Sequence, residues 1–255
     1  MKQKTAFTLI ELLVVIGIMS LLMGILIPTL SSAKQHSQSF VCLNNLRQMV
    51  IAVTMYADNN DSYFPMAYIT EKNGSTRKSI AWDFTNVDDA GKKYTEPGLL
   101  WQGQMVEKIQ QCPSFKDNAT WMNDPYTGYN YNTSYIGGNC AVKDGVVLRN
   151  TVTMSARSTN IRKPESCAIF GDGQWKDGAN KFMRSPFPGP HDGGFSGNWA
   201  GTQGYRHSGK TNVAWCDGSA RSVKGRFTET GSPEENNIAE GTGFLSPDNS
   251  AYDLK

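Results

Sequence analysis

The stretch FTLIELLVVIGIMSLLMGILI, residues 7–27, decides the fold of this chain. It is 21 residues long and contains one charged residue, Glu11. A bilayer hydrocarbon core of about 30 Å needs about 20 helical residues at about 1.5 Å each. The stretch therefore predicts a membrane-spanning helix, and the sequence after it contains no second apolar run of spanning length.

The six residues before this stretch, MKQKTA (1–6), carry Lys2 and Lys4. By the positive-inside rule, we expect this leader to stay cytoplasmic and the rest of the chain to lie outside the membrane. The competing interpretation is a secretory signal peptide, which has a shorter apolar core followed by a small-residue cleavage site. The sequence that follows, PTLSSAK (28–34), continues in helical register, so an uncleaved anchor is favoured.

Glu11 raises a question, because an ionised carboxylate inside a bilayer costs at least about 2.5 kcal/mol and usually has a partner. No Lys or Arg lies between Phe7 and Ala33, so no helical neighbour can neutralise it. Two interpretations follow. Glu11 lies at the membrane interface and reaches water, or it pairs with a cation of another chain, such as a new amino terminus at Phe7.

The segment from Lys2 to Glu11, followed by the apolar run, resembles the cleavage and methylation segment of type IV prepilins and type II secretion pseudopilins. In that family a short basic leader ends just before a Phe, and a Glu is the fifth mature residue. Phe7 and Glu11 have this spacing, but Ala6 stands where the family usually has Gly. The resemblance implies that a prepilin peptidase cuts between Ala6 and Phe7, methylates the Phe7 amine, and leaves Glu11 for assembly.

Beyond Pro28 the pattern becomes amphipathic and predicts an extension of the same helix over 28–58. Pro28 lacks an amide hydrogen, so we expect it to kink or loosen the helix and to matter for assembly. The cluster DNND (58–61) should end the helix. Apolar residues recur at three- and four-residue steps at Ala33, Phe40, Leu43, Leu46, Met49 or Val50, Val53 and Met55 or Tyr56.

Residues 59–255 are expected to form one extracytoplasmic, β-rich domain, because nearly all Gly, Pro and Trp residues lie there. Residues 58–255 hold 21 Lys and Arg against 22 Asp and Glu, which argues against a nucleic-acid surface. We therefore predict an α+β, pilin-like fold: a long N-terminal helix and a C-terminal antiparallel sheet. Expected elements are loops with one or two short edge strands over 66–98, a short helix over 99–111, strands at 128–138, 146–148 and 166–173, a hairpin at 211–223, and a partly mobile tail after 227.

A second motif lies in the predicted hairpin. His207, nine further residues, and then Asp217-Gly218 resemble the H-x9-DG motif of a large subset of pilin-like proteins, which is associated with prepilin-type processing. CLNNLRQ (42–48) and Cys112-Pro113-Ser114 also resemble that family. These resemblances indicate a class of protein without indicating a mechanism.

His207, Asp217 and Asp172 allow two interpretations. Either the histidine caps a loop and the two carboxylates close turns, or the three residues hold a cation. We expect the first, with no metal and no other cofactor. No G-x-S-x-G, no HExxH and no nucleophile beside a base occurs in the sequence, so we do not expect an enzyme.

The five cysteines, at 42, 112, 140, 167 and 216, show neither a CxxC nor a zinc-like Cys/His spacing. An extracytoplasmic domain allows cysteines to oxidise. A disulfide between Cys42 and Cys112 would staple the domain to the helix.

These observations predict a structural subunit of a type IV pilus-like or type II secretion pseudopilus filament, processed by a prepilin peptidase. Its expected partners are other pilin or pseudopilin subunits, the inner-membrane assembly machinery, and membrane lipid before assembly, but no nucleic acid. It would be a single-pass inner-membrane protein with a periplasmic or extracellular C-terminal domain until assembly. The alternative is an anchored binding module whose aromatic-rich insertion, 174–204, binds a glycan or an envelope protein.

Overall fold

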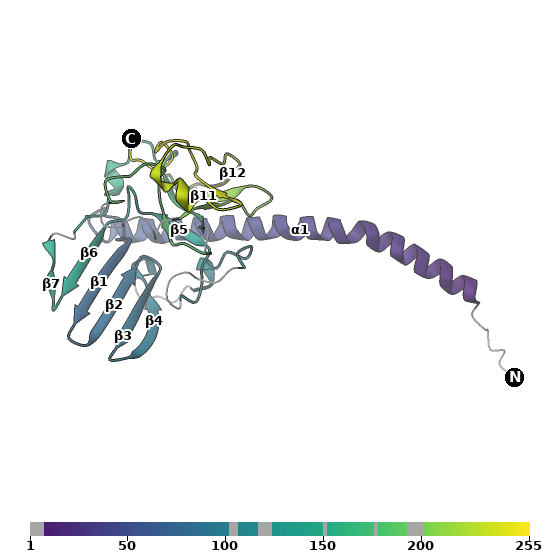
Figure 1. Cartoon of the computed structure of the whole chain (residues 1–255), viewed down its shortest axis with the longest axis horizontal. Helices are drawn as coiled ribbons and strands as arrows, with labels where there is room; N and C mark the ends of the chain where they lie inside the picture. The colour runs from purple at the N-terminus through teal and green to yellow at the C-terminus, as the bar shows by residue number, and fades with distance from the viewer. Residues whose placement is uncertain (1–7, 102–106, 117–123, 150–151, 176–177, 193–200) are drawn as a thin grey trace.

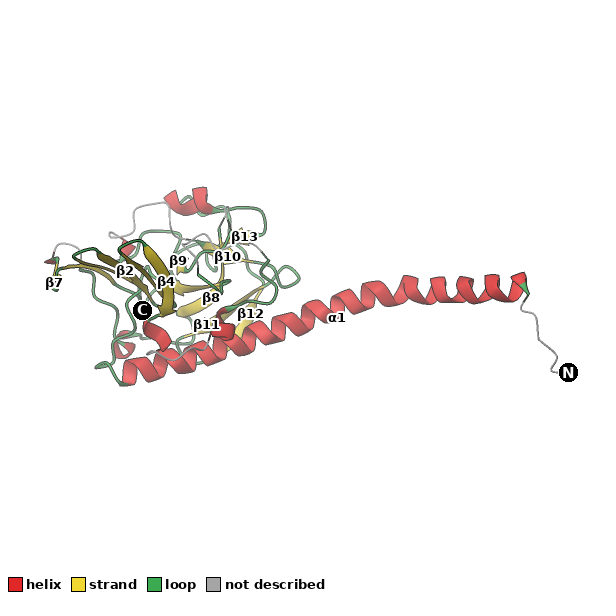
Figure 2. Ribbon diagram, turned by 90° about the horizontal axis from the view of Figure 1, so that it is seen from below, coloured by secondary structure: helices red, strands yellow, loops and turns green. Residues whose placement is uncertain are grey.

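A long helix and a β-rich domain make up the molecule (Figure 1). The computed structural model describes residues 8–101, 107–116, 124–149, 152–175, 178–192 and 201–255. The helix α1, Leu9–Asp58, is 50 residues long. Its C-terminal half lies along one side of the domain, and its N-terminal half projects away from it (Figure 2).

The two halves of α1 have opposite surroundings. Residues 8–37 are all exposed, and within the described residues α1 is the helix that is long and apolar enough to cross a membrane. Helix α1 continues through Pro28 and curves along its free half (Figure 1). The hydroxyl of Thr29 donates to the carbonyl of Leu26 at 2.8 Å, beside the place where Pro28 cannot donate.

The buried stripe of α1 begins at Cys42 and follows helical spacing, as the amphipathic pattern predicts. Phe40 and Met55 were expected on the apolar face, but both are exposed. Phe40 lies two residues before the buried Cys42, and Met55 lies two residues after the buried Val53. Two residues correspond to about 200° around a helix, so both side chains point away from the buried stripe. The buried residues of α1 are Cys42, Asn45, Leu46, Met49, Val50, Val53 and Ala57.

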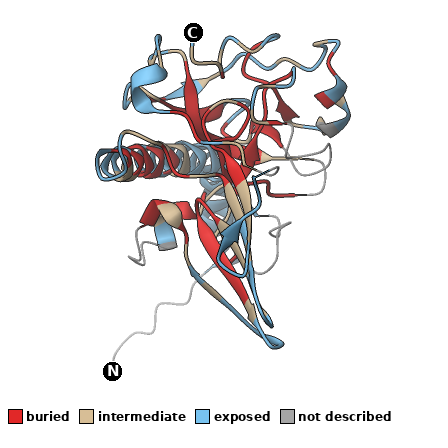
Figure 3. Ribbon diagram, turned by 90° about the vertical axis from the view of Figure 1, so that its left-hand side faces the viewer, coloured by how far each residue is buried: buried red, intermediate tan, exposed pale blue. Residues whose placement is uncertain are grey.

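The first sheet has six strands in the order β4-β3-β2-β1-β6-β7. Strands β1 to β4 form an antiparallel meander, and β6 pairs with β1 in parallel. The prediction of loops with one or two short edge strands over 66–98 is wrong, because polar strands that are exposed toward their turns lack the apolar alternation on which the prediction depended (Figure 3). The strands are β1 Tyr68–Asn73, β2 Thr76–Ala81, β3 Phe84–Asp89, β4 Lys92–Pro97, β6 Asn139–Lys143 and β7 Val146–Val147.

The second sheet has the order β12-β11-β8-β10-β13, with β5 also pairing with β8 and β9. The predicted hairpin is formed by β11 and β12, and the predicted strand at 166–173 corresponds to β8. The α+β prediction is confirmed, with sheets that are mixed because β1–β6 and β5–β9 pair in parallel. The strands are β5 Tyr129–Asn132, β8 Ala168–Gln174, β9 Phe182–Met183, β10 Thr202–Gly204, β11 Thr211–Trp215, β12 Ala220–Val223 and β13 Thr242–Gly243.

Short 3-10 segments complete the described chain. The helix expected over 99–111 is represented by two of them, η1 and η2, on either side of residues 102–106, which lie outside the described residues. The segments are η1 Leu99–Trp101, η2 Glu107–Gln110, η4 Ser158–Asn160 and η6 Pro233–Asn237.

The main core joins the buried stripe of α1 to the aromatic residues of the domain. The rings of Trp82, Tyr131 and Phe170 lie with centroids 5.2–5.7 Å apart. A second apolar cluster includes Leu245 and Tyr252 from the C-terminal segment. The expectation of a partly mobile tail is therefore wrong for these residues, because their side chains are buried.

A buried charge cluster holds residue 181 against the first sheet. The Lys181 ammonium lies 2.9 Å from Asp83 and 2.5 Å from Asp124, and all three side chains are more than nine-tenths buried. Burial raises the pKa of Asp83 to about 6, although the charge of Lys181 opposes that rise. For Lys181, burial lowers the pKa, but the two carboxylates outweigh it and the net shift is upward.

Removing the cation should therefore destabilise the domain. We expect Lys181→Met to lower the free energy of unfolding by about 3–5 kcal/mol, because two carboxylates would stay buried without a counter-charge. The measurement is denaturant unfolding of the full chain in detergent, followed by tryptophan fluorescence. Lys143→Met on the exposed end of β6 is the control, with an expected change within about 0.5 kcal/mol. Equal effects of the two substitutions would contradict the assignment.

Candidate functional site

The start of α1 is closed by a reciprocal capping box. The Glu11 carboxylate accepts hydrogen bonds from the Thr8 backbone nitrogen and hydroxyl, both at 2.8 Å, and the Glu11 nitrogen donates to the Thr8 hydroxyl at 3.3 Å. The T-x-x-E spacing of these two residues is the signal that sequence reasoning missed. Thr8 is neutral, and no salt bridge within the described residues involves Glu11, so the described part of the chain supplies no counter-charge to this carboxylate.

The predicted processing residues, Ala6 and Phe7, lie outside the described residues. After Glu11, α1 presents apolar side chains all around, and its large apolar residues from Leu9 to Leu30 are 41–82% exposed. The few hydroxyls there are satisfied within the helix, as when Ser20 donates to the carbonyl of Ile16 at 2.7 Å. Such a segment suits lipid, where polar groups must find internal partners.

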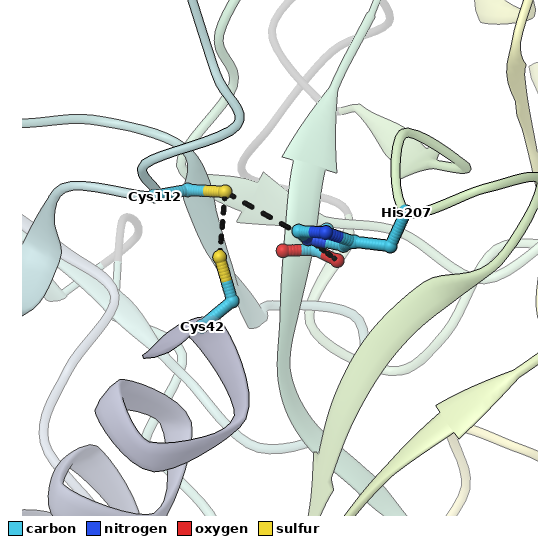
Figure 4. Close-up of side chains that lie close together, drawn as sticks. Cys42, Cys112 and His207 are labelled. Carbon is cyan, nitrogen blue, oxygen red and sulfur yellow. Dashed lines mark hydrogen bonds and ion pairs between the residues drawn. The ribbon is translucent and has the colours of Figure 1, made fainter. Parts of the chain in front are cut away.

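A second constellation lies inside the domain, where α1 first becomes buried. It consists of Cys42 on α1, Cys112 after η2, Asp172 on β8 and His207 before β11. One potential metal-ligating atom from each of the four residues lies within 4.8 Å of all the others, and all four residues are buried. Figure 4 shows Cys42 and His207 facing Cys112 from different elements. The set could therefore hold one cation.

The pairwise distances define the geometry of this four-residue cluster. The two sulfur atoms of Cys42 and Cys112 are 3.0 Å apart, and both residues are free cysteines. The Nε2 atom of His207 lies 3.9 Å from the Cys112 sulfur and 3.1 Å from Asp172 Oδ2. Its Nδ1 atom lies 3.4 Å from the hydroxyl of Ser114.

Backbone features bring these side chains together. His207 and Lys210 exchange backbone hydrogen bonds across a tight turn that ends just before β11. Asp172 Oδ2 accepts a hydrogen bond from the Asn212 nitrogen at 2.6 Å, which fixes the carboxylate beside β11. Gly128 has a positive φ of 123°, and a Cβ there would lie 2.6 Å from the Cβ of Cys112. Glycine is needed at 128 so that the Cys112 segment can approach.

Arg206 lies beside the cluster and contacts its carboxylate. Its guanidinium donates to the carbonyls of Gly128 and Gly173, lies 4.9 Å from the ring centroid of Phe115, and is 3.6 Å from Asp172 Oδ1. The fork of an arginine suits several acceptors held in fixed positions.

The electrostatics of the cluster favour a charged pair. Burial disfavours ionisation of Cys112, but the thiol of Cys42, the charge of Arg206 and the imidazole of His207 outweigh it and lower the Cys112 pKa to about 5. Burial also lowers the pKa of His207, but Asp172 and Cys112 raise it to about 9. The contact with Cys112, together with burial, raises the pKa of the Cys42 thiol. These opposite shifts in pKa favour a Cys112 thiolate beside a protonated His207.

The structure brings His207 and Asp172 together but leaves Asp217 elsewhere. Asp217 is exposed at the β11–β12 turn, where its Oδ1 accepts a hydrogen bond from the Ser219 nitrogen at 2.8 Å. Gly218 follows with a φ of 89°. Asp217 and Gly218 thus close a hairpin, and the ligating atoms beside His207 and Asp172 come instead from the two cysteines.

The other cysteines are placed differently. Cys167 and Cys216 share a thiol hydrogen bond and a backbone hydrogen bond of 3.0 Å. Cys140 lies on β6, with its sulfur 4.0 Å from that of Met66. Among the described residues, none of these three joins a group of three or more potential metal ligands.

Comparison with known proteins bears on the N-terminal segment. The family described as "Prokaryotic N-terminal methylation motif" matches residues 1–27. The chain carries this motif. The type IV wide pilus major component PilA4 of Thermus thermophilus is 40% identical over 63 residues, which are 25% of this chain and 48% of that protein. The chain thus spans about half the length of that relative, and no solved structure matches it. These findings confirm the predicted resemblance to type IV pilins.

Arg206 gives a test of how the cluster in this pilin-like protein is held together. We expect Arg206→Lys to lower the free energy of unfolding by about 1.5–3 kcal/mol, because lysine keeps the charge but cannot reach all of the acceptors. Arg162→Lys at an exposed position is the matched control and should be nearly neutral. Denaturant unfolding of both full-length variants gives the comparison, and an unchanged Arg206→Lys would show that the fork geometry is unimportant.

Proposed function

We propose that this protein is a structural subunit of a type IV pilus-like or type II secretion pseudopilus filament, processed by a prepilin peptidase. The methylation motif at residues 1–27 and the similarity to PilA4 support this proposal. The single observation that carries it is the projecting half of α1, whose large apolar side chains are exposed while its polar backbone groups are satisfied internally.

Such a surface needs two environments in turn. Before assembly, lipid would cover the apolar half of α1, with the domain on the outer side of the inner membrane. After assembly, the same half would pack against α1 of neighbouring subunits and the domains would form an outer layer. In such an assembly, each subunit would bind the next through two different surfaces. These heterologous contacts do not close into a ring, so they can build a fibre.

Glu11 would supply the signal for correct docking. Among the described residues of a single subunit, its hydrogen-bond partner is the neutral Thr8. The methylated amine of Phe7 from a neighbouring subunit would supply the missing cation. Two unit charges about 4 Å apart gain about 4 kcal/mol at an effective dielectric of 20. This gain is comparable with the cost of at least about 2.5 kcal/mol of holding the carboxylate in a bilayer.

The inner-membrane assembly machinery and other pilin-like subunits would be the partners in this process. The alternative of an anchored binding module is less well supported. It requires exposed aromatic side chains in the insertion, where Phe182 is buried and Phe187 is 39% exposed. Part of the aromatic-rich insertion, residues 176–177 and 193–200, lies outside the described residues.

Maturation is the first test of the proposed function. Mass spectrometry of terminal peptides from assembled protein should find N-methylated Phe7, because the resemblance to prepilins implies a cut between Ala6 and Phe7. Ala6→Gly should speed processing, since glycine is the usual residue of the family at that position. An intact MKQKTA terminus in assembled filaments would overturn the proposed cleavage.

Glu11 is the second test. We expect Glu11→Ala to leave cleavage and membrane insertion largely intact but to reduce the yield of sheared filaments sharply, because the intermolecular pair is lost. Thr8→Ala is the matched control: it removes the hydroxyl of the capping box but keeps the Glu11 charge, and should still assemble. Immunoblots of sheared and membrane fractions measure both. If Thr8→Ala reduces the filament yield as much as Glu11→Ala, the role of Glu11 is helix capping.

A further inference from the structure

We propose that Cys42, Cys112, His207 and Asp172 bind one zinc ion at the point where α1 enters the domain. This inference is independent of filament assembly and concerns the single subunit. The four residues come from α1, the segment after η2, β8 and the turn before β11, so a bound ion would tie together parts of the chain that are far apart in sequence.

The distances suit a tetrahedral ion. Zinc binds sulfur at about 2.3 Å and histidine nitrogen or carboxylate oxygen at about 2.0–2.2 Å, which places tetrahedral ligand atoms roughly 3.2–3.8 Å apart. The observed separations are 3.0 Å between the sulfurs, 3.1 Å between His207 and Asp172, and 3.9 Å between His207 and Cys112. Small side-chain rotations are sufficient to place all four atoms on one ion.

The surroundings of Asp172 and His207 are compatible with a ligand at this position. Asp172 is completely buried, and its Oδ1 accepts no hydrogen bond from any described residue, although the Arg206 guanidinium lies 3.6 Å away. Buried carboxylate oxygens ordinarily accept hydrogen bonds, so this oxygen has capacity for a further partner. The Nδ1 atom of His207 faces the Ser114 hydroxyl, an arrangement that orients a histidine whose Nε2 binds a metal.

The choice of zinc follows from the ligand types and the charge. Thiolate and imidazole ligands favour zinc over magnesium or calcium, which prefer oxygen. Two thiolates and one carboxylate carry three negative charges, while zinc and the neighbouring Arg206 carry three positive ones. A buried site needs such a balance because an uncompensated charge in the interior is expensive.

A disulfide between Cys42 and Cys112 is the competing chemistry for this cluster. It would use the two sulfur atoms alone and would give no role to the convergence of His207 and Asp172 on the same point. Cys167 and Cys216 give a contrast, because they are also in contact but have no histidine or carboxylate grouped with them among the described residues. A tetrahedral ion uses all four ligands, whereas a disulfide needs only the two cysteines.

The position of the ion would give it a mechanical role. Cys42 is the first buried residue of α1, so force applied to the projecting half reaches the domain there. An ion that binds only the folded arrangement would stabilise that arrangement and resist separation of helix and domain.

The direct test is metal analysis of the full chain, extracted in mild detergent without chelator or added metal. We expect about one zinc ion per chain. Cys42→Ser and His207→Gln should lose it, while the double substitution Cys167→Ser/Cys216→Ser and the single Cys140→Ser should retain it. Loss of zinc from the double variant with retention in Cys42→Ser would place the ion elsewhere and overturn the assignment.

A second measurement avoids variants that could fail to fold. Ser114→Ala removes only the hydroxyl beside His207 and should weaken zinc affinity about 10- to 100-fold, measured by competition with a chromophoric chelator. Replacement of zinc by cobalt(II) should give thiolate charge-transfer absorption that is absent in Cys42→Ser. Metal-free protein in which peptide mapping finds a Cys42–Cys112 disulfide would overturn the proposal, as would a chain that neither retains zinc nor binds added zinc after reduction.

Discussion

Packing of the C-terminal half of α1 against β8, β11 and β12 holds the helix and the domain in one geometry. Leu46, Met49 and Val53 are almost completely buried in this contact. Each buried apolar side chain of this size stabilises the fold by about 1.5–3 kcal/mol. The buried stripe begins at Cys42, whereas residues 8–37 are all exposed in the described part of the chain.

Helix α1 therefore presents polar groups in two different settings, one at its N-terminus and one where it enters the domain. At the N-terminal end, the Glu11 carboxylate has a neutral capping partner, and under the proposed function its cation would come from a neighbouring subunit. At the domain boundary, Cys42 faces a thiol, an imidazole and a carboxylate that are already positioned inside the fold. In these proposals, the first arrangement would favour association between subunits, and the second would favour integrity of the single subunit.

Buried charges also connect segments that are remote in sequence. Lys181 joins Asp83 to Asp124, and Arg184 lies 2.9 Å from Glu234. Because a buried charge without its partner is strongly destabilising, these contacts fix irregular segments that have few apolar residues. They explain how a domain with many loops keeps a defined arrangement around a modest apolar core.

The sequence by itself was sufficient to predict the helix, because the length of an apolar segment and the period of its pattern are local properties. Its end at Asp58, the strand at 166–173 and the hairpin closed by Asp217 and Gly218 could all be predicted from nearby residues. The polar meander of β1 to β4 could not, since its strands lack the apolar alternation that marks a half-buried strand.

The capping box of Thr8 and Glu11 was readable from spacing, but the buried cluster was only partly so. The sequence grouped His207 with Asp172 and Asp217, and it singled out a Cys42–Cys112 contact separately. Tertiary structure decided otherwise, because the β8–β11 pairing places Asp172 beside His207 while Asp217 lies at the far end of β11. The packing of α1 then brings Cys42 close to Asp172 and His207, although both lie more than a hundred positions later in the chain. Local sequence patterns fix elements, whereas a site built from four segments depends on how those elements pack.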